Sequence, residues 1–491
     1  MSSPDPEIPL YVDLDGCLLR TDTLWESFAA ALRARPVLAF LALCSLVRGR
    51  AALKHRLAMI GRLDITSMPP HRQFRQWLLG QHAQGRRIVL ATAADALIAA
   101  QVLDQVRDDQ GKPLFAAALS SDGQSNLKGA AKLTAIRADA GDRPFDYCGN
   151  GPEDLVIFAA ARGAIVVGAA RRTLAAAQRA AKVLAVHDPR PSAGERLRAW
   201  LRAVRPHQWL KNLLVLVPLI TSFHFDEARA LACAVLAFVA FSLAASSGYL
   251  LNDLLDLASD RQHPRKRARP FAAGELPVRD GFGAAALLFL AAILLALLIG
   301  PAFTAWVLVY LAMTGLYSAV GKRIALLDVT MLAGLYTVRV LAGGAAIPVE
   351  VSFWLLAFSV FLFFSLALVK RCAELVAQGE RNERTAEGRS YLPGDLPVLQ
   401  MLGVSTSVAA LVVLALYTQI PEVLQRYGSP KMLWLILAGL LILLGRLWLA
   451  TARGRMHDDP LVFLMQDVAS RWMIALLLGL FTAAALLRWP L

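Results

Sequence analysis

Cysteine is scarce in this chain, and no two cysteines are spaced as a pair. The sequence has 491 residues and five cysteines, none in a CxxC motif. A disulfide framework and a cysteine-based zinc site are therefore excluded as organising features. Acidic residues are also outnumbered, since 37 Asp and Glu stand against 51 Lys and Arg, for a net charge of +14. The basic residues gather beside apolar runs, which indicates cytoplasmic loops and anionic lipid headgroups, and we expect no nucleic-acid partner.

Long apolar runs are few in the first 200 residues and frequent after residue 208. The whole chain is 57% hydrophobic, with a mean hydropathy of +0.50. Both values are typical of a polytopic helical membrane protein. We therefore predict a multidomain chain, with a soluble domain at 1–190, a juxtamembrane linker helix within 191–207 and a transmembrane domain at 208–491.

Strand-like runs in the first domain alternate with Ala-rich helical stretches. This alternation predicts an α/β, Rossmann-like fold with a parallel sheet and helices on both of its faces. The five predicted strands cover residues 8–14, 87–91, 114–119, 145–148 and 164–168.

Polar residues follow several of these strands. Asp13 and Asp15 end the first strand, and Thr92 follows the second. Lys128 comes after the third strand, and Asp154 comes after the fourth. Side chains at the carboxyl ends of parallel strands point into the usual active-site crevice of such folds, so we expect these residues to meet there.

These motifs, in this order, resemble the haloacid dehalogenase superfamily of phosphatases over about the first 185 residues. The resemblance implies that Asp13 is the nucleophile and Asp15 the general acid and base. It implies that Thr92 and Lys128 bind the phosphoryl group, and that Asp154 binds Mg²⁺ together with Asp13 and Asp15. An inactive domain that serves as a scaffold is the alternative.

Two residues depart from the pattern of that superfamily. Cys17 stands where Thr is common, and Asn150 stands where the family often has Asp, which removes one charge from the metal site. Residues 24–85 fall where the superfamily often inserts a cap, so we predict a helical cap there. Its apolar stretch 36–46 is too short for a bilayer, which needs about 20 residues. A buried cap helix and a helix lying in the membrane surface both remain open for this stretch.

The second domain is predicted to be all-α, with about nine transmembrane helices. Placing the positively charged loops inside puts the first domain and both predicted active sites on the cytoplasmic side of the inner membrane. The amino terminus lacks the basic region and apolar core of a signal peptide, which is consistent with that topology. The nine predicted spans lie near 208–224, 228–252, 282–299, 303–320, 325–344, 352–371, 399–418, 430–450 and 470–488.

A group of carboxylates stands at the exit of one apolar run. Asp253, Asp256 and Asp260 are spaced i, i+3, i+7, which places them on one face of a helix, and Asn252 precedes them. Carboxylates on one face repel each other unless a cation lies among them, and oxygen ligands suit Mg²⁺. All four residues are therefore candidate metal ligands.

A cationic run follows at residues 261–269 and includes Lys266 and Arg269. Such side chains clamp phosphates. Carboxylates followed by cations at a membrane boundary predict a site for a Mg²⁺-bound phosphorylated substrate. A loop whose arginines only set the topology is the simpler interpretation, but it does not account for the carboxylates.

The segment 252–270 resembles the UbiA superfamily of intramembrane prenyltransferases, whose fold has nine spans. A second aspartate-rich motif, usual in aromatic prenyltransferases, is absent, because residues 317–339 contain one aspartate, Asp328. The match is closer to the branch of decaprenyl-phosphate phosphoribosyltransferases, through residues 205–212 (RPHQWLKN) and 263–270 (HPRKRARP).

That branch implies transfer of phosphoribose from phosphoribosyl pyrophosphate (PRPP) to polyprenyl phosphate. Asp253 and Asp256 would then be catalytic, with Mg²⁺ neutralising the leaving pyrophosphate. A further polar cluster at 370–395 lies in a predicted cytoplasmic loop that could close over the site. The implied substrate-binding residues are Lys211, Asn212, Lys266, Arg269, Lys322, Tyr336 and Arg339.

Fusion of the two domains suggests a two-step enzyme. A phosphoribosyl lipid retains a 5-phosphate, and a phosphatase on the same chain would remove it to give polyprenyl-phosphate ribose for envelope glycans. A prenyltransferase acting on a small acceptor and a non-catalytic membrane scaffold are the alternatives. The resemblance leaves a homo-oligomer open.

Overall fold

The computed structural model describes residues 7–188, 190–224, 226–379, 391–456 and 460–486. The chain forms two compact units, which are described separately below. The first contains Met1–Arg205 together with Tyr249–Leu287, and the second contains Pro206–Gly248 together with Leu288–Leu491. Residues 249–287, which the sequence assigns to the transmembrane domain, therefore pack with the N-terminal unit.

A six-stranded parallel sheet forms the centre of the first unit, so the predicted parallel α/β class is confirmed. Its strand order is β3-β2-β1-β4-β5-β6. The sixth strand was not predicted, because it lies in an Ala- and Arg-rich stretch and is only partly buried. The strands are β1 (Leu10–Val12), β2 (Ile88–Asp95), β3 (Ala117–Ser121), β4 (Asp146–Gly149), β5 (Gly163–Val167) and β6 (Val183–His187).

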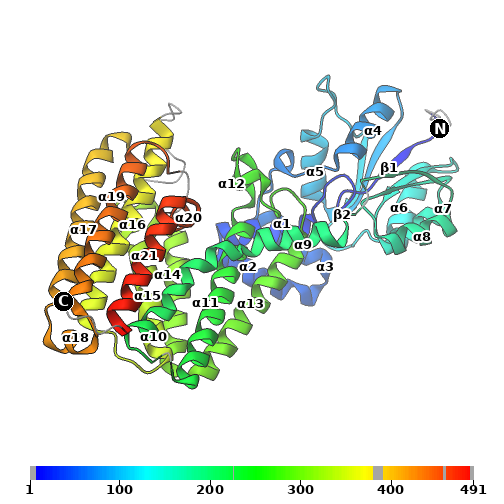
Figure 1. Cartoon of the computed structure of the whole chain (residues 1–491). Helices are drawn as coiled ribbons and strands as arrows, with labels where there is room; N and C mark the ends of the chain where they lie inside the picture. Colours follow the sequence, from blue (N-terminus) through cyan, green and yellow to red (C-terminus); the bar gives the residue numbers. More distant parts are fainter. Residues whose placement is uncertain (1–6, 189, 225, 380–390, 457–459, 487–491) are drawn as a thin grey trace. The chain divides into compact units, whose positions relative to one another are not determined.

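Helices cover both faces of the sheet (Figure 1). Alternation along β1 sends Leu10 and Val12 into one core, with Phe74 of α4. Tyr11 points into the other core, with Ile136 of α6. The covering helices are α4 (Arg72–Ala83), α5 (Ala96–Gln105), α6 (Ala130–Ala140), α7 (Leu155–Ala160) and α8 (Arg171–Ala180).

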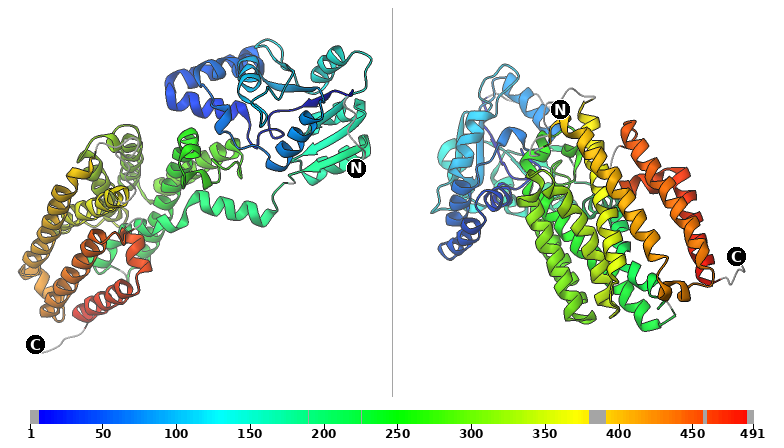
Figure 2. Two further views of the ribbon diagram at one scale, coloured as in Figure 1. Left: turned by 90° about the horizontal axis from the view of Figure 1, so that it is seen from above. Right: turned by 90° about the vertical axis from the view of Figure 1, so that its left-hand side faces the viewer.

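Helices also form the predicted insertion between the first two motifs. Alanines and leucines of these helices make a small core of their own, separate from the sheet. Figure 2 shows the group in blue beside the sheet. Its members are α1 (Thr23–Ala34), α2 (Pro36–Leu43), the 3-10 helix η1 (Cys44–Arg48) and α3 (Arg50–Ile60).

The helix α9, Ala193–Val204, lies within the stretch that the sequence assigns to the linker. Ser192 and Glu195 form a reciprocal capping box at its start, which satisfies amides that a helix leaves unpaired. After α11 ends at Leu255, the short helices α12 (Leu257–Gln262) and η5 (Lys266–Ala268) complete the first unit before α13 begins.

A buried ion pair joins α12 to α1. The guanidinium of Arg261 donates to both carboxylate oxygens of Glu26, at 2.6 and 3.1 Å. Thr21 adds a hydroxyl donor to the same carboxylate at 2.6 Å. The two charged side chains are only 5% and 3% exposed, so each depends on the other for compensation.

Eight helices of the described residues are long and apolar enough to cross a membrane. The predicted first span, 208–224, is not among them. It is divided into a 3-10 helix, η4 (Pro206–Leu216), and a short helix, α10 (Val217–Thr221), with Pro218 in the first turn of the latter. The eight are α11 (Ala228–Leu255), α13 (Val278–Ile299), α14 (Pro301–Ala319), α15 (Leu327–Ala346), α16 (Phe353–Gly379), α17 (Leu396–Tyr417), α19 (Leu433–Ala452) and α21 (Val468–Leu486).

The helix α15 is the most buried of these eight. It packs against α14, α16 and η4, all within the second unit (Figure 1). The contact with η4 is close, because a Cβ on Gly343 would lie 2.1 Å from the carbonyl oxygen of Val215. A side chain at position 343 would therefore separate α15 from η4.

We expect Arg261→Ala to destabilise the protein strongly, because it leaves the carboxylate of Glu26 buried without its cation. Loss of one partner of a buried pair costs about 3–5 kcal/mol. Thermal unfolding in detergent, with Glu26→Ala and the double variant, gives the coupling energy. The exposed pair Arg107–Asp104 is the matched control. Strictly additive effects in the double variant would contradict the coupling.

Candidate active sites

The turn after β1 carries the first candidate site. Asp13 and Asp15 flank Leu14, and Gly16 follows with a φ of +70°. A Cβ at Gly16 would lie 1.9 Å from Nδ2, the side-chain amide nitrogen of Asn150. Glycine is therefore required here both by the backbone conformation and by the close approach of Asn150.

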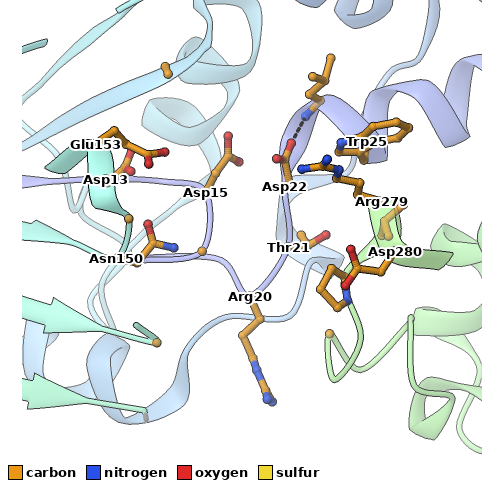
Figure 3. Close-up of a pocket in the computed structure, with 18 of the residues that line it drawn as sticks. Asp13, Asp15, Arg20, Thr21, Asp22, Trp25, Asn150, Glu153, Arg279 and Asp280 are labelled. Atoms are coloured by element: carbon orange, nitrogen blue, oxygen red, sulfur yellow. Dashed lines mark hydrogen bonds between the residues drawn. The ribbon is translucent and has the colours of Figure 1, made fainter. Parts of the chain in front are cut away.

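This turn lies on a cavity of about 1160 Å³. Figure 3 shows Asp13, Asp15 and Asn150 on one side of it, and Trp25, Arg279 and Asp280 on another. The cavity wall thus combines the sheet, the helical insertion and the start of α13, all of which belong to the first unit.

Asp13 is paired with a lysine that sequence reasoning missed. The ammonium of Lys132 lies 2.9 Å from Oδ1 of Asp13 and 4.0 Å from Asp154, and its side chain is buried. Lys128 also lines the cavity but pairs with Glu153 at 2.9 Å. Lys132 lies four residues further along, within α6, and the sequence offers no signal that separates the two lysines.

The two aspartates titrate differently. Burial raises the pKa of Asp13 to about 6, with Lys132 opposing the rise. Burial, together with the carboxylate of Asp22, raises the pKa of Asp15 to about 8. At neutral pH Asp15 therefore holds a proton while Asp13 is largely ionised. That difference suits a nucleophile beside a proton donor.

Asp154 and Thr92 lie close by, but protein donors occupy them. Tyr147 donates to Oδ1 of Asp154 at 2.8 Å, and the amides of Asn150 and Gly151 donate to Oδ2 at 3.0 and 2.9 Å. Thr92 is buried inside β2, where its hydroxyl accepts from the amide of Ala94. It is not among the residues that line the cavity.

The residues described by the structure contain no group of three or more His, Cys, Asp or Glu side chains arranged around a metal position. Asp13, Asp15 and Asn150 nevertheless bring oxygen donors to the same cavity. Burial without enough compensating charge raises the pKa of both aspartates, and a bound cation would relieve that penalty. The donor set therefore fits Mg²⁺.

The second predicted cluster is bridged by arginines. Arg205 donates to both oxygens of Asp253, at 2.7 and 2.8 Å. Arg269 contacts Asp253 at 3.0 Å and Asp260 at 2.7 Å, which joins the two carboxylates. Both aspartates are buried. The cation expected among these carboxylates is thus supplied by the protein itself.

The expectation of one continuous helical face fails at Asp256, because α11 ends at Leu255 and Asp256 caps the next helix. Its carboxylate is held by Asn252 at 3.2 Å and by Arg33 instead. Lys266 is exposed in η5. As arranged, Asp253, Asp256 and Asp260 do not form one metal site.

A third cluster lies inside the second unit, around Arg339. This guanidinium donates to Oδ1 of Asn212 at 2.8 Å and to the hydroxyl of Tyr310 at 3.3 Å. Its carbon lies 4.7 Å from the centre of the Tyr310 ring and 5.8 Å from that of Tyr336. Lys211 lies 5.9 Å from the Tyr336 ring. Four predicted residues thus meet here, and Tyr310 was missed.

Arg339 carries its charge within a span and is only 4% exposed. A charge at that depth costs at least about 2.5 kcal/mol on insertion scales. Among the residues that the structure describes, no carboxylate pairs with it. The cluster is therefore a buried positive centre that an anionic ligand would neutralise.

The buried carboxylate of Asp328 is paired within the protein. Tyr391 donates to Oδ1 of Asp328 at 2.5 Å, and Arg371 lies 2.5 Å from Oδ2. The half-buried Lys322 lies in the short 3-10 helix η6, Gly321–Arg323, just before α15. Part of the polar cluster predicted at 370–395 is thus explained by a buried ion pair. Residues 380–390 lie outside the described part of the chain.

These features define a multi-pass membrane protein with a parallel α/β domain and charged clusters suited to phosphates. Residues 215–468 match the UbiA prenyltransferase family. A relative from Sinorhizobium fredii, protein y4nM, is 35% identical over 98% of this chain and 92% of its own length. The chain belongs to the UbiA prenyltransferase family.

Two further comparisons concern the membrane part. The decaprenyl-phosphate phosphoribosyltransferase of Mycobacterium tuberculosis is 36% identical over 179 residues, which is 36% of this chain and 59% of that protein. A solved UbiA homologue from Archaeoglobus fulgidus, bound to GPP and Mg²⁺, aligns with a TM-score of 0.45 and 18% identity. That alignment covers 59% of this chain and all of the homologue.

We expect Asp15→Asn to stabilise the metal-free protein at pH 8 but hardly at pH 4. The pKa of about 8 means that folded Asp15 keeps a proton which the unfolded chain releases above its ordinary value of 3.8. This contribution to stability is therefore present at low pH and is lost as the pH rises toward 8.

Thermal unfolding in detergent with a chelator, followed from pH 4 to pH 8, measures this effect. Asp104→Asn is the control, because Asp104 is exposed and forms only a surface pair with Arg107. An Asp15→Asn variant whose pH dependence matches that of the wild type would show that Asp15 is not protonated at neutral pH.

Proposed function

We propose that this chain is a bifunctional membrane enzyme. It transfers 5-phosphoribose from PRPP to polyprenyl phosphate and then removes the 5-phosphate to give polyprenyl-phosphate ribose. The observation that carries the transfer step is the buried guanidinium of Arg339, which has no carboxylate partner among the described residues. Phosphate groups of the two substrates supply the missing negative charge.

The similarity to decaprenyl-phosphate phosphoribosyltransferase supports this choice of substrates. The lipid phosphate is already ionised, so its oxygen attacks the anomeric carbon without a strong base, and pyrophosphate leaves. Arg339 and Lys211 bind phosphate oxygens, and Asn212 holds Arg339 in place. We propose Lys266, Arg269, Lys322 and Tyr336 as further substrate contacts.

We propose Mg²⁺ as the cofactor of the transfer step. The oxygen donors nearest to the cationic run are Asn252, Asp253, Asp256 and Asp260, and Mg²⁺ prefers such ligands. Bound there, the ion would neutralise charge on pyrophosphate. Since arginines hold these carboxylates in the structure, Mg²⁺ binding requires the ion pairs to open.

For the second step we propose a phosphatase of the haloacid dehalogenase type. The carboxylate of Asp13 attacks the phosphorus, so an oxygen–phosphorus bond forms and the bond to the ribose 5-oxygen breaks. Asp15 gives its proton to that oxygen. Water then releases phosphate from Asp13, with Asp15 taking the proton back. Lys132 offsets the negative charge, and Asp154 positions the loop of Asn150.

Mg²⁺ bound by Asp13, Asp15 and Asn150 would stabilise negative charge on the phosphoryl oxygens. We place both steps on the cytoplasmic side of the inner membrane, because the positive loops favour that side. A homo-oligomer stays a prediction.

A UbiA prenyltransferase that moves an isoprenoid to a small acceptor is the second candidate, and the family match favours it. The two differ in the group that reaches the lipid. A prenyl diphosphate donor leaves no ribose on the product, whereas PRPP does.

We expect purified protein with polyprenyl phosphate, Mg²⁺ and PRPP labelled in ribose to form a ribose-labelled lipid and free phosphate. Asp13→Asn should stop at the phosphorylated lipid, because it lacks the attacking carboxylate. Thin-layer chromatography and mass spectrometry of the lipid follow both steps. A lipid product without ribose would exclude phosphoribosyl transfer. Release of phosphate by the Asp13→Asn variant would exclude Asp13 as the nucleophile.

We expect Lys132→Met to lower phosphate release about 10²–10³-fold, the usual cost of one preorganised electrostatic contact. Lys128→Met is the matched control, since Lys128 pairs with Glu153 rather than Asp13. Release is measured as single-turnover hydrolysis of the isolated phosphoribosyl lipid. If Lys128→Met lowers phosphate release more than Lys132→Met does, Lys128 rather than Lys132 is the lysine that offsets the negative charge at Asp13.

A further inference from the structure

The outer surface of α2 and η1 is apolar to an unusual degree. Val47, Val37 and Phe40 are 93%, 70% and 59% exposed, and no charged residue lies between Arg35 and Arg48. Such a contiguous apolar surface is uncommon on a soluble domain and marks a binding surface. We call residues 36–48 the apolar face.

The exposed side chains of the apolar face do not belong to the hydrophobic core of their own domain. Ala39 and Ala42 are the residues that α2 buries, against Leu53 and Leu57 of α3. The small side chains thus point inward and the large ones outward, which is the reverse of a cap helix that packs on its own domain. The larger residues of α2 therefore require an environment outside the domain.

The charged side chains within residues 27–63, the stretch that contains the apolar face, are of one sign. No Asp or Glu occurs between Glu26 and Asp64, whereas Lys and Arg are frequent. Basic residues beside an apolar helix attract anionic lipid headgroups. The basic residues of this stretch are Arg33, Arg35, Arg48, Arg50, Lys54, Arg56 and Arg62.

The length of the apolar face limits how deeply it can enter a bilayer. Residues 36–48 are too few to cross a bilayer, which needs about 20 residues, but suffice to lie in the interface. The chain itself supplies attachment to a bilayer, because eight helices within the described residues are long and apolar enough to span one. The lipid surface, with its negative charge, is therefore the occupant that matches both the apolar side chains and the arginines.

The face also continues into the candidate phosphatase cavity. Leu46, which is half exposed, lines that cavity together with Arg50 and Leu53. Leu24, Trp25 and Val278 extend this apolar wall. The opposite part of the cavity holds Asp13 and Lys132, so apolar and phosphate-binding surfaces share one space.

We propose that the apolar face docks the N-terminal unit onto the anionic surface of the bilayer, and that Leu46 and its neighbours guide the isoprenoid part of a lipid-linked phosphate monoester toward Asp13. The choice of substrate rests on the proposed phosphatase function, whereas membrane docking does not. The face thus selects membrane-borne over soluble phosphate esters.

The native Cys44 lies exposed within the face and serves as the probe position. The full chain, with Cys233→Ser, is labelled at Cys44 with a fluorophore and reconstituted into phosphatidylglycerol-containing bilayers with brominated acyl chains. The other three cysteines are buried. The matched control carries Cys44→Ser and a label at Gln110→Cys, an exposed loop position.

We expect bromine to quench the label at position 44 and to leave the label at position 110 unchanged. The double variant Phe40→Asp/Val47→Asp should abolish the quenching. If bromolipid quenches the labels at positions 44 and 110 equally, docking to lipid is wrong. If the emission of the label at position 44 changes with protein concentration but not with bromolipid, the face instead binds a protein partner or a second copy.

Activity tests the second half of the proposal. Neither Phe40 nor Val47 lines the cavity, so the double variant should hydrolyse p-nitrophenyl phosphate as the wild type does. Hydrolysis of the phosphoribosyl lipid in bilayers should fall about tenfold or more, because two large apolar side chains no longer bury themselves in the bilayer. Met59→Asp, at an exposed position of α3 outside the face, is the control.

An equal fall for both substrates would overturn a role of the face in selecting lipids. A wild-type protein that hydrolyses neither substrate would instead refute the phosphatase, while the quenching result would still decide whether the face meets lipid.

Discussion

Compensation of buried charge is the constraint on which the rest of this structure depends. Glu26 is held by Arg261, Asp13 by Lys132, and Asp328 by Arg371, all with little exposure to solvent. An isolated charge in such surroundings would be far more costly than a paired one. These pairs therefore fix which helices meet. Two of the described sites keep an imbalance: Lys132 faces a turn that carries both Asp13 and Asp15, and Arg339 has no carboxylate partner among the described residues.

Those two places carry opposite deficits. The turn after β1 has an excess of carboxylate, and burial raises the pKa of Asp13 and Asp15. The Arg339 cluster has an excess of positive charge and aromatic neighbours. A site short of cations suits a metal and a phosphoryl transfer, whereas a site short of anions suits phosphate binding. The two units thus carry local charge of opposite sign at these two sites.

The aspartate-rich segment packs with the parallel α/β domain in a single compact unit. Arg33 of the helical insertion contacts Asp256, and Glu26 of the same helix contacts Arg261. Residues 274–280, a little further along, line the cavity of Asp13. The segment that identifies the transferase family is therefore also a structural part of the candidate phosphatase.

The parallel α/β class and most of the membrane helices could be predicted from the sequence, because periodicity and apolar length are local properties. The sequence also singled out Arg339, since a charge inside an apolar run is visible without a fold, whereas Asn212 came only from the resemblance. Tertiary structure alone decided that Lys132 rather than Lys128 meets Asp13, and that arginines separate Asp256 from Asp253. It also divided the expected first span at η4. Those outcomes depend on which side chains reach one another across elements, and no spacing along the chain encodes that distance.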